Sequence, residues 1–178
     1  MAESWYPDNY YTTPKPHYKT MPDFLRLEDL FSLTLEPDAQ HFWRKQRNVA
    51  LEQWKPAINI KIREQPFGFG YRRHRVTLDV QQNVNDLGGL ACFGCDPFTG
   101  DECRPCAKRG IGWIKVDTDV WTQAWTARNG TYLRYIIAHE FGHTLGFQHG
   151  GTGIMDATPY HAQVNAEEIQ AAKAYWGT

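Results

Sequence analysis

The 178-residue sequence has no long hydrophobic run, no excess of charge of either sign and no internal repeat. No apolar stretch approaches the roughly 20 residues of a membrane-spanning helix, so we expect no membrane among its partners. The formal net charge of −1 creates no broad electrostatic field, which argues against nucleic acid as a partner. The first residues lack the basic start and apolar centre of a signal peptide, which favours a cytoplasmic or particle-associated location over secretion.

Hydrophobic residues (42%) and charged residues (22%) occur in the proportions of a soluble globular domain. Residues 29–178 are long enough for one such domain with a hydrophobic core. Residues 1–28 differ, because aromatic side chains and prolines are mixed there in a composition that suits neither helix nor strand. We therefore expect an extended N-terminal arm, which is either a poorly ordered tail or a segment that lies against its own domain or a neighbouring chain.

Hydrophobic periodicity predicts the order strand, helix, three strands, long helix and short helix. Alternating apolar residues predict strands at FSLTLEP (31–37), INIKIRE (58–64), RRHRVTLDV (72–80) and IGWIKVD (111–117). Helical spacing predicts helices over residues 38–54 and 131–147, and Asn165 with Glu168 forms a capping box that opens a last helix. Residues 83–110 are rich in Gly, Asp, Pro and Cys and have no period, which predicts a long structured loop.

The stretch HEFGHTLGFQH (139–149) contains three histidines and one glutamate. On a helix, His139 and His143 lie one turn apart on one face, so both imidazoles can bind a single Zn²⁺. Glu140 adjoins the first ligand and can accept a proton from a metal-bound water. Gly146 lets the helix end and the chain turn, which brings His149 to the metal as a third ligand and leaves a fourth position open for water.

The pattern H-E-x-x-H-x-x-G-x-x-H resembles the zinc signature of the metzincin metallopeptidases. GGTGIMDATP places Met155 in a glycine-rich turn, as in the methionine turn of that clan. The segment from Phe31 to Gly177, including GTYLRYIIAHEFGHTLGFQH and VNAEEIQAAKAYWG, is most similar to the matrixins, the matrix-metalloproteinase type. This resemblance implies an α/β (α+β) fold with a twisted mixed sheet of four to five strands, a long active-site helix, a methionine turn under the zinc and a C-terminal helix.

The same resemblance implies a zinc-dependent endopeptidase that acts on a peptide or protein substrate, with Glu140 as general base. It further implies that the strand at residues 111–117 lies at the cleft rim and pairs with an extended substrate backbone, and that residues after the methionine turn wall the pocket for the side chain after the cut. The residues so implied in substrate binding are Trp113, Ile114, Lys115, Val116, Thr158 and Tyr160.

Three features depart from the family pattern. No cysteine-switch propeptide is visible, and Ala157 stands where astacins and serralysins have a tyrosine, which argues against those groups. The loop in which matrixins bind structural zinc and calcium has a different sequence here, and it contains cysteines. Its candidate calcium ligands are Asp96, Asp101 and Glu102, although scattered acids are more often simply solvated.

The segment CFGCDPFTGDECRPC supplies two C-x-x-C pairs with seven residues between them. Each pair can present two thiolates to one metal, and four thiolates complete a closed tetrahedral structural zinc site. Two disulfides or free thiols are the alternatives, and the lack of a signal peptide favours zinc. The four cysteines are Cys92, Cys95, Cys103 and Cys106.

A second class of function fits part of the sequence. A structural or assembly component, for example one built into a virion, could retain a metzincin fold and use the N-terminal arm to bind a neighbouring subunit. Glu140 separates the two hypotheses, because a purely structural zinc site does not need it. Its presence favours the enzyme.

Overall fold

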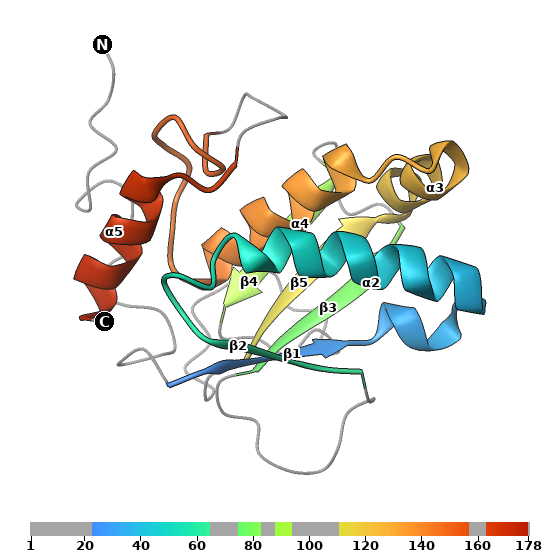
Figure 1. Ribbon diagram of the computed structural model, residues 1–178, viewed down its shortest axis with the longest axis horizontal. Coiled ribbons are helices and arrows are strands. Elements are labelled where there is room, and N and C mark those ends of the chain that lie inside the picture. The colour runs from blue at the N-terminus through green and yellow to red at the C-terminus, as the bar shows by residue number, and fades with distance from the viewer. Residues whose placement is uncertain (1–22, 65–74, 83–87, 94–110, 157–162, 178) are drawn as a thin grey trace.

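A computed structural model describes residues 23–64, 75–82, 88–93, 111–156 and 163–177 (Figure 1). In these ranges one strand and two helices come first, four strands follow, and three helices end the chain segment. The elements are β1 (Leu25–Asp29), the 3-10 helix η1 (Phe31–Thr34), α2 (Pro37–Glu52), β2 (Ile60–Arg63), β3 (Arg75–Gln81), β4 (Gly89–Phe93), β5 (Ile111–Asp117), α3 (Thr118–Ala127), α4 (Thr131–Thr144) and α5 (Ala166–Trp176). None of the helices in the described ranges is both long and apolar enough to cross a bilayer.

The strands form one sheet in the order β2-β1-β3-β5-β4. Strands β2, β1, β3 and β5 are parallel, whereas β4 runs antiparallel to β5 and lies at one edge. The mixed five-stranded sheet, the long helix and the C-terminal helix confirm the predicted α+β fold class.

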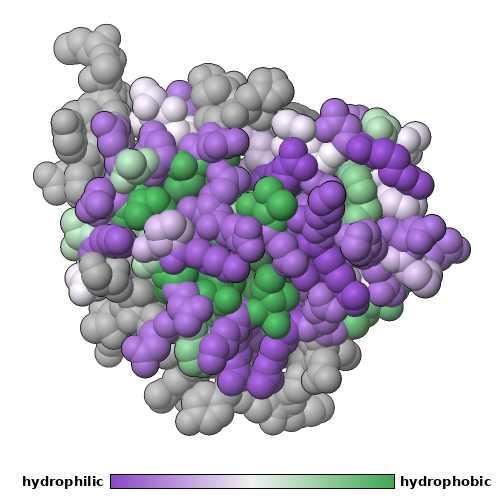
Figure 2. All heavy atoms as spheres, in the orientation of Figure 1, coloured by the Kyte–Doolittle hydropathy of each residue, from purple (hydrophilic) through white to green (hydrophobic). Residues whose placement is uncertain are grey.

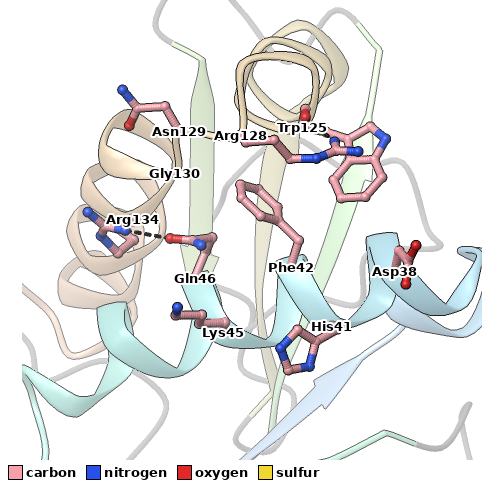
Figure 3. A pocket seen from close by; sticks show the side chains of 10 residues that line it. All are labelled: Asp38, His41, Phe42, Lys45, Gln46, Trp125, Arg128, Asn129, Gly130 and Arg134. Atoms are coloured by element: carbon pink, nitrogen blue, oxygen red, sulfur yellow. Dashed lines mark hydrogen bonds between the residues drawn. The ribbon is translucent and has the colours of Figure 1, made fainter.

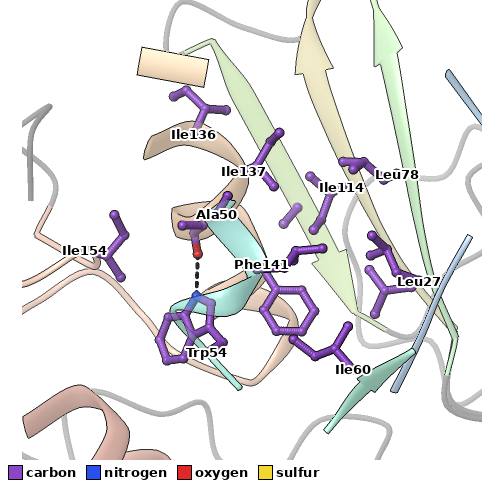
Figure 4. Close-up of a cluster of buried hydrophobic side chains, with 14 of the residues drawn as sticks. Leu27, Ala50, Trp54, Ile60, Leu78, Ile114, Ile136, Ile137, Phe141 and Ile154 are labelled. Carbon is purple, nitrogen blue, oxygen red and sulfur yellow. Dashed lines mark hydrogen bonds between the residues drawn. The ribbon is translucent and has the colours of Figure 1, made fainter. Parts of the chain in front are cut away.

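The core lies between the sheet and the two long helices α2 and α4 (Figures 1 and 4). Leu27, Leu78 and Ile114 contribute from three adjacent strands and are fully buried. From α4, the buried side chains of Ile137 and Phe141, which are four residues apart and therefore on one face of the helix, meet them. This packing fixes the direction of α4, the helix that carries the candidate site.

The predicted strand at residues 31–37 is wrong. Residues 31–34 form η1, and the strand lies earlier, at β1, where Leu25 and Leu27 face the core. The buried carboxylate of Asp29 explains the break, because it accepts the backbone N–H of Ser32 (3.3 Å) and the indole N–H of Trp43 (2.8 Å). A side-chain carboxylate that accepts a backbone N–H three residues later favours a turn at that point over a continued strand. Strand β1 begins within the segment 1–28, of which residues 1–22 lie outside the described ranges.

Two further elements were not predicted. The interval 83–110, predicted as a loop throughout, contains the short strand β4, and α3 follows β5 directly. The signal for α3 was present in the sequence, since the Asp117 side chain caps the helix by accepting the N–H of Asp119 at 2.8 Å. The other predicted helices and strands are confirmed, including the capping box of Asn165 and Glu168 at the start of α5.

Candidate metal centre and active site

Helix α4 carries the first two histidines and the glutamate of the motif. It is buried on nearly every side, so its position is set by packing against the sheet, α2 and the chain that follows it. The helix ends at Thr144, and Gly146 turns the chain with φ +99°, a conformation that glycine adopts at low cost. The turn is held by Phe147 N–H, which donates to the Gly142 carbonyl at 3.2 Å.

Three histidine side chains meet at one point beside the end of α4. The Nε2 atoms of His139 and His149 are 3.1 Å apart, and each lies 3.2 Å from Nε2 of His143. Three nitrogens bound to a tetrahedral zinc ion at about 2.0–2.1 Å would lie about 3.3 Å from one another. The predicted triad is therefore brought together at a spacing that fits zinc.

The tautomers of two histidines follow from their partners. Nδ1 of His139 lies 2.6 Å from the Ile154 carbonyl oxygen, and Nδ1 of His143 lies 2.8 Å from that of Phe147. A carbonyl oxygen only accepts, so each Nδ1 carries the proton and each neutral ring turns an unprotonated Nε2 toward the common point. Lone pairs facing one another this closely need a cation between them.

Burial keeps these imidazoles neutral. Desolvation lowers the pKa of His139 to about 4 and the pKa of His143 to about 3, and it also lowers the pKa of His149. Because a histidine must be deprotonated to bind a metal, all three are ready to act as ligands at neutral pH.

Glu140 is buried beside the triad. Desolvation raises the pKa of Glu140 to about 8. A divalent cation on the adjacent histidines opposes that shift, because an opposite charge stabilises the carboxylate. Metal binding and ionisation of Glu140 are therefore coupled.

Strand β4 passes close to this side chain at Gly89. A Cβ atom at position 89 would lie 3.0 Å from Cγ and from Oε1 of Glu140, and 2.5 Å from Cγ2 of Ile136. The absent side chain lets the edge strand approach α4 closely. This role of Gly89 was not visible in the sequence, where position 89 fell inside a presumed loop.

Substitution of Gly89 by Ala is expected to lower kcat for the peptide cleavage that the sequence resemblance implies by roughly 10- to 100-fold, because displacement of the expected general base by about 1 Å has effects of this size. Zinc content should remain at the wild-type level, since no histidine contacts the new methyl group among the atoms nearest to it. The comparison of kcat with zinc stoichiometry checks this. Unchanged kcat in a folded Gly89→Ala protein would contradict the proposed contact.

Met155 lies beneath α4 and is fully buried. A Cβ atom on Gly142 would come within 2.3 Å of its sulfur, so the missing side chain at Gly142 makes room for Met155 against α4. The turn that holds it is closed by Gly150 N–H, which donates to the Met155 carbonyl at 3.0 Å.

Glu168 anchors the methionine turn, a role that the sequence did not reveal. Its fully buried carboxylate accepts the N–H groups of Ile154 (3.1 Å), Met155 (2.9 Å) and Asn165 (2.9 Å). The Ile154 carbonyl in turn accepts Nδ1–H of His139. A chain of hydrogen bonds thus joins α5 to the first histidine of the triad.

The predicted substrate-pairing strand is wrong in one respect. Strand β5, with Trp113, Ile114, Lys115 and Val116, is paired on both sides, to β3 and to β4, so its backbone has no free edge. The edge beside the site belongs to β4. Thr158 and Tyr160 lie outside the described residues, as do Cys95, Cys103, Cys106 and the three acids of the same loop.

Comparisons with known proteins bear on this arrangement. A search of curated proteins gave no match. One solved chain, from a structure titled "GM1 bound form of the ECX AB5 holotoxin", is 12% identical, with a TM-score of 0.45 over 96% of this chain and 76% of that chain, a similarity too low to indicate a shared fold. The sequence model of the Matrixin peptidase family matches residues 32–173, which include the three histidines and Glu140. The chain therefore belongs to the matrixin family of zinc metallopeptidases.

Proposed function

We propose that this zinc-dependent endopeptidase uses His139, His143 and His149 to hold its metal and Glu140 as its general base. The observation that carries the proposal is the convergence of three Nε2 atoms within 3.2 Å, next to a buried carboxylate. Zinc bound there supplies Lewis acidity, which polarises the scissile carbonyl and acidifies water. Glu140 accepts the proton of the attacking water at a carboxylate oxygen and delivers it to the leaving amine.

The edge of the sheet at β4 is the surface that we propose for substrate binding. Among the described residues β4 is the edge strand of the sheet and pairs with β5, and a Cβ atom at Gly89 would lie 3.0 Å from the Glu140 side chain. A substrate peptide that lies extended along this strand would place a scissile bond beside the Glu140 carboxylate. Residues Trp113–Val116 of β5 would then hold β4 in place by pairing with it on the side away from the substrate. Tyr160 remains a proposed wall of the substrate pocket.

Removal of the metal tests the proposed function. Dialysis against a chelator should abolish cleavage of a mixed peptide library and lower Tm, because an ion that binds only the folded chain stabilises it. Readdition of one equivalent of Zn²⁺ should restore both. Cleavage that persists in protein shown to be zinc-free by elemental analysis would contradict the metal-dependent mechanism.

A second zinc site formed by Cys92, Cys95, Cys103 and Cys106 is also proposed. Its support is the spacing of the two C-x-x-C pairs, of which Cys92 lies in β4 and the other three cysteines lie between the paired strands β4 and β5. Elemental analysis should give two zinc ions per chain for the wild type and one for Cys103→Ser/Cys106→Ser. One zinc in both proteins, with four thiols blocked until reduction, would indicate disulfides. The calcium ligands proposed in the same loop rest on the sequence alone.

The segment 1–28 is proposed to contact a neighbouring subunit of an assembly, for example a virion. Its aromatic and proline-rich composition supports this. Analytical ultracentrifugation tests it, because removal of residues 1–22 should convert an oligomer to monomer. A wild-type chain that sediments as a monomer at every concentration would remove the basis for this proposal and for a particle-associated location.

A further inference from the structure

A groove lies between α2, α3 and the start of α4, at the opposite end of α4 from the histidines (Figure 3). Its volume is about 600 Å³, in the range of ligand-binding clefts. Phe42 points into it from α2, and Arg128 extends over Trp125 on the other side. Where α4 and α2 face each other, Arg134 donates to Gln46 at 2.5 Å. We call it the α2–α3 groove.

The α2–α3 groove is positively charged. Lys45, Arg128 and Arg134 line it, and none of the three forms an ion pair within the described part of the chain. Asp38 is the only acidic residue among the described residues that line it. Gly130, the N-cap of α4, also lines the groove, so the positive end of the helix dipole adds to the same field. This concentration of charge contrasts with a chain whose net charge is −1.

The aromatic side chains in the groove do not offer the surfaces that nucleobases or sugars need. The guanidinium carbon of Arg128 lies 3.2 Å from the ring centroid of Trp125, which covers one face. Trp121 is stacked parallel to Trp125 with centroids 6.0 Å apart, and Phe42 meets Trp125 edge-on at 5.5 Å. Recognition therefore falls to the cationic groups.

Arg128 occupies a backbone conformation that L-residues seldom adopt. It caps α3 with φ +52° and ψ +34°, where Gly or Asn is usual and most other side chains are strained by roughly 1 kcal/mol. The guanidinium lies on the Trp125 ring at the groove, where Arg128 is exposed and can meet a partner. Figure 2 shows that hydrophilic side chains dominate the face over α2 and α3, with only separate hydrophobic patches. This face therefore does not have the continuous apolar surface of a hydrophobic protein interface.

We propose that the α2–α3 groove binds an acidic segment of a protein partner, through carboxylates that pair with Lys45, Arg128 and Arg134. The proposal rests on charge complementarity. Three cations that have no carboxylate partner in the described ranges surround a cleft large enough for several side chains. Such a site acts independently of peptide hydrolysis. It would hold a partner at the far end of α4 from the zinc ligands.

The test uses the zinc-loaded Glu140→Gln protein, so that the probe cannot be cut by the proposed mechanism. Fluorescence anisotropy compares a labelled decapeptide of alternating Glu and Ser with a matched peptide of alternating Gln and Ser. The acidic peptide alone should bind, and its affinity should fall as ionic strength rises to about 0.15 M. Lys45→Glu should weaken it about 5- to 30-fold, because attraction becomes repulsion at an exposed site.

Two variants separate binding from folding. Arg128→Gly removes the charge but suits the left-handed backbone, so Tm should stay close to the wild-type value while affinity falls about fivefold. Lys61→Glu, an equal charge change on strand β2, should leave binding unaltered. Failure of the acidic peptide to bind, or equal weakening by Lys61→Glu, overturns the proposal. Displacement of the peptide by low-millimolar inorganic phosphate overturns it in favour of a small-anion site.

Discussion

Substitution of Glu140 by Gln is expected to lower kcat for peptide cleavage by about 10²–10⁴-fold, the usual contribution of a general base. Gln has the same shape but cannot take a proton from water at neutral pH. Zinc content should not change. The rings of His139 and His143 are oriented by the Ile154 and Phe147 carbonyls, and these hydrogen bonds do not involve the Glu140 carboxylate. Steady-state kinetics and elemental analysis on the same preparation give both quantities.

Two further variants sharpen the result. Glu140→Asp keeps the charge but shortens the side chain, so activity should be intermediate if the position of the carboxylate matters. Glu167→Gln changes an exposed carboxylate on α5 and should leave kcat unaltered. Full activity of zinc-loaded Glu140→Gln would show that proton transfer is carried by another group and would remove the basis for the assigned role.

Substitution of Glu168 by Ala should destabilise the protein by about 3–5 kcal/mol. Three backbone N–H groups lose their common acceptor, and each buried donor left without one costs about 1–3 kcal/mol. For a chain of this size Tm should fall by about 6–20 °C. Zinc affinity should fall as well, by about 10- to 100-fold, because the Ile154 carbonyl that orients His139 loses its support.

The Glu168 prediction has a matched neighbour. Glu167 lies in the same first turn of α5 but is exposed, so Glu167→Ala should cost less than about 1 kcal/mol through the helix dipole alone. Glu168→Gln should destabilise the protein by an amount between these two values. Its amide keeps one accepting oxygen, but its NH₂ group faces backbone N–H groups that are also donors. Thermal unfolding and competitive zinc titration distinguish the cases. A Glu168→Ala protein with normal Tm and normal zinc affinity would contradict the anchoring role.

The candidate site was predictable because its chemistry is local in sequence. His139, Glu140 and His143 lie on one helix, and His149 follows after the turn at Gly146, so a helix and one short turn bring them together. The supports of that site were not predictable, because they come from distant segments. Neither the contact of Gly89 with Glu140 nor the bond of Glu168 to the Met155 N–H leaves a trace in any short window of sequence.

The fold shows the same division. Long periodic segments such as α2 and α4 were predicted, whereas short elements failed where a single side chain or a neighbour decides the backbone. At residues 31–35 the apolar alternation favoured a strand, but the Asp29 carboxylate holds the Ser32 N–H, and Leu33 is 40% exposed instead of buried. Strand β4 exists because β5 offers it a partner, which its own five residues could not reveal.

The anchoring of the methionine turn by α5 sets an order of events during synthesis. His149 leaves the ribosome before Glu168, by about 1–4 seconds at 5–20 residues per second. In that interval a nascent chain has all three zinc ligands but lacks the carboxylate that fixes Ile154 and, through it, His139. The metal site therefore reaches its full zinc affinity only after α5 packs against the methionine turn. A nascent chain in which α5 is incomplete should bind zinc more weakly and cleave peptides more slowly than the finished chain.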